Sequence, residues 1–337
     1  MINILKMKTK FTIYKLHFTT PLHLGDERDD YSISLKTFQS DAMYAALTSC
    51  LAKLGKEIPA DGDLGFTISS LFPFYQKDKD ANAVYFFPKL LKQKLPDLKD
   101  LSKAKAVKKV SWLDTNYFEK LIIGTVLFEN DQEIGHIQGN FVSSTVIDEN
   151  FISSQVSPRV TVSRDYTEDA KPFYMDRVFF KDYSGLYFIV EGETKLLEGA
   201  LNVLKDEGIG TDRNVGNGFF EFKKDEIELD LPKSDFVTNL SMFCPESEQQ
   251  LKQMLDSDDI AYDFTKRGGW ITTNPHNSIR KNSINMFLPA SVFKAEKNIS
   301  EILIKGEILD LKPKADLGIK HPIWRNGESI FIPVIII

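Results

Sequence analysis

The chain has 337 residues, which is long for one compact domain and sufficient for two. Hydrophobic residues make up 42% and charged residues 27%, so a packed core is expected and wholesale disorder is excluded. The formal net charge of −6 argues against a simple nucleic-acid binder, although a local basic surface on an acidic subunit of a larger assembly is compatible with it.

The two cysteines, Cys50 and Cys244, are too few for a disulfide framework or a four-ligand zinc site, so no metal or cofactor is expected. The lysine-containing N-terminus has no long apolar run, and no stretch approaches the length of a membrane-spanning helix. These features predict a cytoplasmic protein without a membrane partner.

The first elements of the chain read as strand, loop and helix. Bulky and polar residues alternate over 11–18, which predicts a strand. Ser40 and Asp41 are typical of a helix cap, and the apolar spacing that follows predicts a helix ending at Gly55. Residues 89–109 carry eight lysines against two aspartates, which indicates a solvated helix or loop, or alternatively a phosphate-facing patch.

The middle of the chain contains a long polar segment between apolar elements. Residues 136–172 have little helical signal, which favours a functional loop or an extended hairpin. Strands are predicted over 176–180 and 185–191, followed by a helix over 195–206.

The second half is expected to begin after a linker near 223–233, where acidic residues and Pro232 accumulate. It contains a predicted helix over 246–255, a basic loop over 266–281 and a final buried strand within 330–337. Its order partly repeats the βα…ββα…β order of the first half, which indicates two related α+β domains.

Four glycines between 208 and 218 form the most unusual stretch of the sequence. Gly208, Gly210, Gly216 and Gly218 have the spacing G-x-G-x5-G-x-G, and Arg213 lies between them. Glycine permits positive φ and close approach of a ligand, and an arginine can grip a phosphate. The loop lacks the Lys-Ser/Thr of a phosphate-binding NTPase loop and precedes a strand rather than a helix, so nucleotide hydrolysis and hydride transfer are unsupported.

A glycine loop of this form after a helix resembles the signature of the RAMP superfamily of CRISPR proteins. Further stretches resemble one branch of it, the fourth subunit of the Csm (type III-A) effector complex. They are spread over nearly the whole chain: PLHLG, SDAMYAAL, PRVTVSRDY, FYMDRVFF, GLYFIVEGE and KADLGIKHPIWRNGESIFIPV.

The resemblance implies two ferredoxin-like (RRM-like) domains of class α+β. The N-terminal domain would cover 1–225, with a thumb hairpin inserted at about 136–172 and the glycine loop at 208–218, and the C-terminal domain would cover 226–337. The thumb would press into the guide–target duplex and displace a base pair.

The resemblance also implies a function and its partners. The chain would bind the repeat-derived 5′ handle of the CRISPR RNA, lie near the target RNA, and contact the Cas10-type large subunit and a Csm backbone subunit. It would be non-catalytic and would need no cofactor.

The candidate RNA-binding residues are glycines, cations and small polar residues of the loops and helix starts. We expect the loop after the first strand to face the glycine loop, with His23 either contacting RNA or serving the fold. The full set is His23, Gly25, Ser40, Arg159, Arg164, Gly208, Gly210, Arg213, Gly216, Gly218, Lys266, Arg267, Arg280 and Lys281. The last four flank Trp270, and basic residues around an aromatic suit single-stranded RNA or form a solvated loop.

Three alternatives remain open from the sequence. The first is a RAMP endoribonuclease that processes CRISPR RNA, with His23 as its acid or base, although the sequence reveals no His–Tyr–Lys grouping. The second is the equivalent handle-binding subunit of a Cmr (type III-B) complex. The third is a structural adaptor without RNA contact.

Overall fold

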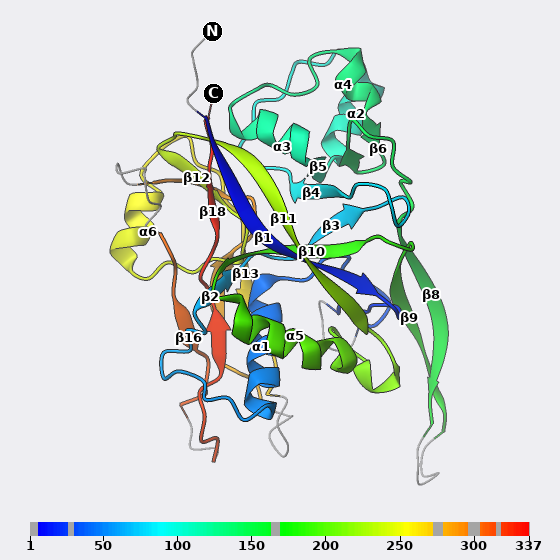
Figure 1. The fold of residues 1–337 in the computed structure, drawn as a ribbon, viewed down its shortest axis with the longest axis vertical. Helices are drawn as coiled ribbons and strands as arrows, with labels where there is room; N and C mark the ends of the chain where they lie inside the picture. The colour runs from blue at the N-terminus through cyan, green and yellow to red at the C-terminus, as the bar shows by residue number, and fades with distance from the viewer. Residues whose placement is uncertain are drawn as a thin grey trace.

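The computed structural model describes residues 6–25, 30–162, 169–271, 279–295, 304–314 and 318–336. Helices and strands are mixed along the chain, so the predicted α+β class is confirmed. In Figure 1 a long twisted sheet crosses the molecule, with two helices beneath it, a helical subdomain above it and a two-stranded hairpin at one side.

Strand β1 (Lys6–Phe18), predicted over 11–18, lies inside the largest sheet. It pairs antiparallel with β10 (Gly185–Gly192) on one side and, along all 13 of its residues, with β11 (Phe220–Pro232) on the other. The sheet continues from β10 through the order β3-β4-β5-β7-β6, while β2 also pairs with β10. These strands are β2 (Phe66–Ile68), β3 (Phe72–Tyr75), β4 (Val84–Pro88), β5 (Trp112–Asp114), β6 (Ile137–Gln138) and β7 (Phe141–Val142).

Two helices predicted from apolar spacing cover one face of this sheet. They are α1 (Ser40–Lys53) and α5 (Thr194–Glu207), which lie side by side beneath the strands in Figure 1. Their buried side chains, among them Met43, Leu47 and Leu201, pack with Leu16 of β1 in one core cluster. Burial of these apolar faces is what stabilises helices of this length.

The opposite face of the sheet carries a second core to which distant parts of the chain contribute. Ile13 of β1 and Phe87 of β4 pack there with Phe118 of α3 (Thr115–Ile122). Val292 and Ile332, from the last fifth of the chain, belong to the same cluster. The two halves of the chain therefore share a hydrophobic core.

The lysine-rich segment 89–109 ends in the short helix α2 (Leu101–Lys109). Val107 is its buried residue, and Asp100 caps it by accepting hydrogen bonds from the backbone of Ser102 and Lys103. The predicted solvated helix or loop is thus confirmed as a helix preceded by irregular chain. Together with α3 and α4 (Asp131–Gly135) it forms the subdomain above the sheet in Figure 1.

The second half of the chain contains a small three-stranded sheet, two short hairpins and helix α6 (Glu248–Met254), which was predicted over 246–255. The strands are β12 (Phe236–Asn239), β15 (Val292–Lys294) and β18 (Phe331–Pro333), then β13 (Phe264–Arg267) with β14 (Ile284–Phe287), and β16 (Ile308–Asp310) with β17 (Trp324–Asn326). The final strand is buried, as predicted.

The linker expected near 223–233 is wrong, because β11 runs through this segment to Pro232. Acidic residues suggested solvated chain, but they alternate with buried Ile227, Leu229 and Leu231. Such alternation belongs to a half-buried strand rather than to a linker.

A hairpin of β8 (Ile152–Thr161) and β9 (Lys171–Phe180) extends away from the sheet (Figure 1). Its ten-residue ladder begins and ends later than the segment 136–172, in which a loop or hairpin was expected. Residues 137–138 and 141–142 instead form β6 and β7 of the main sheet.

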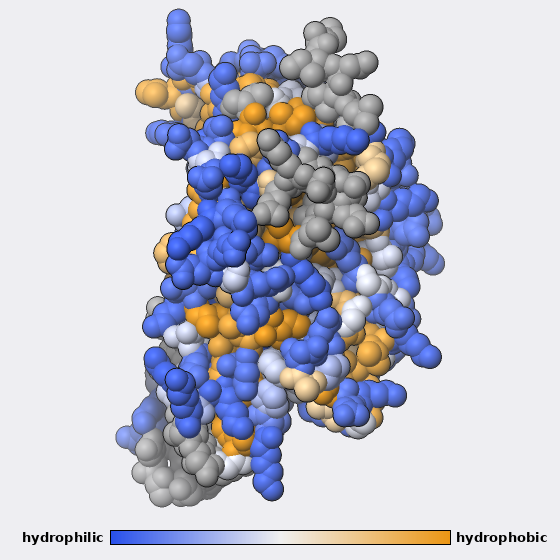
Figure 2. Space-filling model, turned by 90° about the vertical axis from the view of Figure 1, so that its left-hand side faces the viewer, coloured by the Kyte–Doolittle hydropathy of each residue, from blue (hydrophilic) through white to orange (hydrophobic). Residues whose placement is uncertain are grey.

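Hydrophilic side chains cover much of the face seen in Figure 2, and apolar groups lie exposed between them. Within the part of the chain that the structure describes, no helix is both long and apolar enough to cross a bilayer.

Candidate nucleic-acid interface

The glycine loop joins the end of α5 to the start of β11, as the sequence predicted. All four glycines have positive φ: 77° at Gly208, 89° at Gly210, 87° at Gly216 and 77° at Gly218. A short 3-10 turn, Arg213–Val215, lies between the two pairs. Residues with a Cβ adopt this backbone at an energetic cost, so the spacing of the glycines follows from the path of the loop.

The glycine loop packs directly on the PLHLG loop after β1. The N–H of Thr211 donates to the carbonyl of His23 at 2.9 Å, and the N–H of Gly218 donates to the carbonyl of Pro21 at 2.8 Å. A Cβ at Gly210 would lie 2.3 Å from the His23 carbonyl oxygen. The expectation that these two loops face each other is therefore confirmed.

Most of the glycine N–H groups are already used within the protein. Gly208, Gly216 and Gly218 donate to the carbonyls of Leu204, Arg213 and Pro21. The fourth glycine N–H, that of Gly210, has no acceptor among the described residues. The loop therefore offers few free backbone N–H groups to a ligand, because the helix end, the 3-10 turn and the PLHLG loop supply acceptors for them.

Arg213 is the cation that the loop presents to solvent. Its side chain is exposed, and its Nη1 lies 3.5 Å from the carbonyl oxygen of Gly208. Such a long contact is weak, so the guanidinium keeps donors available for an external phosphate.

His23 is buried, with 1% of its surface exposed, and therefore does not line an open surface. Its Nδ1 lies 2.6 Å from the carbonyl oxygen of Asp176 in β9, and its ring stacks on Tyr31 with 5.7 Å between the ring centroids. Of the two roles weighed for His23, this geometry supports the structural one. Gly25, two residues further on, is exposed.

Ser40 and Asp41 are not the cap of α1, contrary to the sequence prediction. Gln39 occupies the cap position, and its side chain makes no capping hydrogen bond. Ser40 is buried, and its Oγ accepts from the N–H of Met242 at 2.8 Å, which joins the helix start to the second half of the chain.

Asp41 is fully buried and forms ion pairs with two arginines of the second half. Arg267 of β13 donates through Nε to Oδ2 at 2.8 Å and through Nη2 to Oδ1 at 3.0 Å. Arg325 of β17 donates through Nη1 to Oδ2 at 2.5 Å. Burial raises the pKa of Asp41, but Arg325 and Arg267 outweigh it and hold the pKa below its ordinary value.

The four basic residues that flank Trp270 in the sequence, Lys266, Arg267, Arg280 and Lys281, have different surroundings in the structure. Arg267 is committed to Asp41, whereas Lys266 is exposed on the same strand. Arg280 lies over the ring of Trp270, 4.9 Å from its centroid, and the backbones of these two residues form an antiparallel bridge. Lys281 is half-buried beside them.

The hairpin carries Arg159 on β8, opposite Phe173 of β9, and this arginine is partly exposed. Arg164 lies outside the described residues. A possible RNA contact by either arginine stays a prediction.

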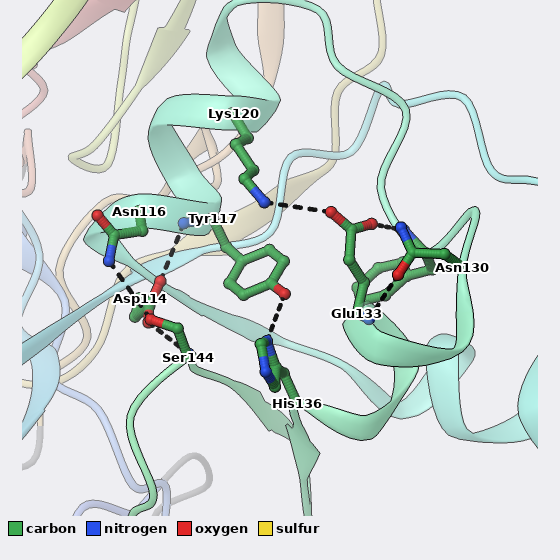
Figure 3. A network of polar contacts seen from close by, with 9 residues as sticks. Asp114, Asn116, Tyr117, Lys120, Asn130, Glu133, His136 and Ser144 are labelled. Atoms are coloured by element: carbon green, nitrogen blue, oxygen red, sulfur yellow. Dashed lines mark hydrogen bonds and ion pairs between the residues drawn. The ribbon is translucent and has the colours of Figure 1, made fainter.

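The structure also brings together a His–Tyr–Lys grouping that was not found in the sequence (Figure 3). The Tyr117 hydroxyl lies 2.7 Å from Nδ1 of His136, and Nζ of Lys120 lies 4.8 Å from the centroid of the Tyr117 ring. Lys120 is paired with Glu133 at 3.2 Å, and Tyr117 is only 2% exposed. A tyrosine buried in this way cannot reach a substrate, so the grouping fastens α3 to α4.

The ion pair between Asp41 and Arg325 was not predicted from the sequence. Arg325 lies within the HPIWRNG stretch, which supported the resemblance, but it is 284 positions from Asp41. No local pattern connects two residues so far apart.

Comparison with known proteins agrees with this architecture. Residues 232–334 match the family model described as the CRISPR Csm4 C-terminal domain. The Csm4 protein of Streptococcus thermophilus is 26% identical over 334 residues, covering 94% of this chain and 98% of its own length. The Csm4 protein of Thermococcus onnurineus is 25% identical over 276 residues, covering 78% of each chain.

Two solved structures share the fold over almost the whole chain. One is a Csm1–Csm4 cassette in complex with pppApA, with a TM-score of 0.56 and 19% identity, covering 97% of this chain and 99% of the matched chain. The other is a Csm3–Csm4 subcomplex of the type III-A interference complex, with a TM-score of 0.56 and 18% identity, covering 96% and 99%. The fold is that of the Csm4 chains in these type III-A CRISPR assemblies. Residues 232–334 match the C-terminal domain model of Csm4, and almost the whole chain is similar in sequence to Csm4 proteins.

Alanine at Gly210 should destabilise the protein more than alanine at Gly216. Both positions have a similar positive φ, which costs an alanine about 1–2 kcal/mol. Only at Gly210 would the new Cβ meet the His23 carbonyl, whereas nothing lies within 4 Å at Gly216. Urea unfolding of both variants measures the difference. Equal free energies of unfolding would show that the close packing of the two loops contributes nothing.

Replacing Asp41 with Asn should destabilise the fold by about 3–5 kcal/mol, because two arginines lose their buried counter-charge. The exposed Asp206→Asn in α5 serves as the matched control. Since the pKa of Asp41 is lowered in the folded protein, its contribution is present above the ordinary Asp pKa and is lost as the pH falls through the folded value. Urea unfolding at neutral and acidic pH tests this, and a difference that persists unchanged at low pH would contradict it.

Proposed function

We propose that the chain is a non-catalytic subunit of a type III-A CRISPR effector complex that binds the repeat-derived 5′ handle of the guide RNA. The observation that supports this most is the packing of the glycine loop on the PLHLG loop, with Arg213 exposed at its turn. A tight backbone surface with an exposed arginine suits phosphate, because that contact requires charge and close approach rather than base identity.

The partners that we propose for this chain are those of similar Csm4 chains in solved assemblies. The Csm4 chains of similar fold occur in assemblies with Csm1 and with Csm3. We infer that this chain bridges the Cas10-type large subunit to a backbone subunit, in the cytoplasm, while its glycine loop faces the RNA. Co-purification with Csm rather than Cmr subunits distinguishes this from a type III-B role.

The first half is interpreted as one ferredoxin-like domain. Strands β1, β3, β10 and β11 alternate with α1 and α5, and they lie in the sheet order β11-β1-β10-β3, which is 4-1-3-2 within a β-α-β-β-α-β unit. The boundary expected between 225 and 226 falls inside β11, so we propose that the division lies after this strand, near residue 232, where the match of the C-terminal family model begins. For the second half, the sheet β15-β12-β18 with α6 is the corresponding core.

The hairpin β8–β9 is the proposed thumb. Val156, Val160 and Tyr174 are more than half exposed, at 54%, 56% and 65%, although they are apolar or aromatic. An exposed two-stranded hairpin with such residues suits insertion against a partner rather than solvation. We propose that it lies against the guide–target duplex, with Arg159 near the RNA backbone.

The proposal assigns no catalytic step to this chain. The rival endoribonuclease needs a histidine that reaches a ribose hydroxyl, and His23 is buried against Asp176. In the His–Tyr–Lys grouping, His136 is hydrogen-bonded to the hydroxyl of buried Tyr117. Neither histidine is placed to act on RNA, and no cofactor is part of the proposed function.

Arg213→Ala should weaken binding of the handle by about tenfold or more, because a charge-assisted contact to phosphate is lost. The measurement is fluorescence anisotropy with a fluorescein-labelled RNA of the repeat-derived handle. Arg213→Lys should lose less, since it keeps the charge without the two-donor geometry.

Asn214→Ala is the matched control, because Asn214 is exposed in the same turn and carries no charge. Its handle affinity should equal that of the wild-type protein. Equal affinity of Arg213→Ala and wild type would remove the glycine loop from the RNA interface.

A further inference from the structure

The PLHLG loop, residues 21–25, lies between the glycine loop and the base of the β8–β9 hairpin. On the side of the glycine loop, the carbonyls of Pro21 and His23 accept backbone hydrogen bonds. On the side of the hairpin, the N–H of Leu22 donates to the carbonyl of Val178 in β9 at 2.9 Å, and the N–H of Val178 donates to the carbonyl of Leu22 at 2.7 Å. In Figure 1 the hairpin leaves the body of the molecule beside the end of β1, which the PLHLG loop follows. One short segment therefore joins the two features to which we assign RNA contacts.

His23 contacts both neighbours at once. Its carbonyl accepts from the N–H of Thr211 in the glycine loop at 2.9 Å, and its ring Nδ1 lies 2.6 Å from the carbonyl oxygen of Asp176 in β9. A carbonyl oxygen has no proton to give, so Nδ1 is the donor of this bond, and the bond fixes the orientation of the ring. The ring is shielded from water, because His23 is 1% exposed.

The loop that contains Tyr31 and Ser34 holds the same point of the hairpin. The N–H of Asp176 donates to the carbonyl of Tyr31 at 2.8 Å, and Oδ2 of Asp176 accepts from the N–H of Ser34 at 3.1 Å. The Tyr31 ring stacks on His23 and also contacts the ring of Phe173 in β9, with 5.4 Å between the two centroids. His23 is thus packed into the base of the hairpin as well as hydrogen-bonded to it.

These contacts lie where β9 leaves the body of the molecule. Met175 and Asp176 are buried, whereas Lys171, Pro172 and Tyr174, nearer the tip, are exposed. A two-stranded hairpin without further support is marginally stable in water, so the direction in which this one points depends on the contacts at its base.

We propose that His23 is a positioning residue that fixes the hairpin to the glycine loop, so that handle RNA bound at the loop also orders the hairpin. This inference rests on the proposed function and adds a coupling between its two RNA-binding features. RNA on the glycine loop restricts the PLHLG loop packed against it, and the Leu22–Val178 pairing and the His23–Asp176 bond pass this restriction to β9. The handle and the guide–target duplex would then meet surfaces that are held in one geometry.

Hydrogen exchange of the full chain, followed by mass spectrometry, tests the coupling with and without saturating RNA of the handle alone. This RNA ends before the guide, so no part of it is assigned to the hairpin. In the wild type we expect exchange to slow within 208–218 and also, by about fivefold or more, within 171–180. Such a response at the hairpin is not expected if His23 only helps the chain to fold.

Two variants separate the hydrogen bond of His23 from the space that it fills. His23→Leu keeps a bulky side chain and the backbone carbonyl but has no donor for Asp176, so RNA should protect 208–218 and leave exchange in 171–180 unchanged. His23→Asn should restore the slowing in 171–180, because its amide nitrogen is bonded to Cγ, as Nδ1 is, and can donate to the same carbonyl. A residue that only filled space would give the reverse order. His321→Leu, at an exposed histidine, is the control and should behave as wild type.

The wild-type comparison decides the coupling even where a variant fails to fold. Protection of 208–218 with unchanged exchange in 171–180 would overturn the coupling and leave the proposed function intact. Full slowing of 171–180 in His23→Leu would overturn the role of His23. Photocrosslinks from the handle RNA to 171–180 would show direct contact and contradict transmission through the PLHLG loop. If anisotropy shows no binding of the handle to the wild type, the proposed function fails and this inference fails with it.

Discussion

The buried carboxylate of Asp41 holds the first helix to the second half of the chain. It forms ion pairs with Arg267 and Arg325, which come from two separate pairs of strands, and it has no exposed surface of its own. A buried ion pair of this kind contributes little compared with a well-packed apolar contact, but removing one partner leaves an unpaired charge in the interior. Asp41 therefore connects α1 to both β13 and β17.

This junction and the glycine loop are connected through the same layer of the fold. α1 packs beside α5, and α5 ends at Gly208, where the loop turns back over the PLHLG segment. The positive φ angles let two backbones approach so closely that no side chain fits between them. Arg213 is exposed on this loop. The loop joins α5 to β11 and packs against the loop that follows β1.

Local patterns in the sequence predicted the elements that bury one face. The strand predicted over 11–18 and the helices α1 and α5 are confirmed, because alternating or helical apolar spacing determines which face is buried. Predictions that depended on distant partners failed. Asp41 resembled a helix cap until Arg325 was placed beside it. The linker prediction failed for a different reason, because it overlooked the local alternation of acidic residues with Ile227, Leu229 and Leu231. The facing of the two loops was expected from the family resemblance, while the consumption of the glycine amides required coordinates.

Photocrosslinking of the assembled complex tests the central claim most directly. The guide RNA would carry a photoreactive base in its 5′ handle, and the crosslinked peptides would be mapped by mass spectrometry. Our account predicts crosslinks within 208–222 of this chain, around Arg213. A handle that crosslinks only to neighbouring subunits would contradict it, and the glycine loop would then be a structural turn of a scaffold protein.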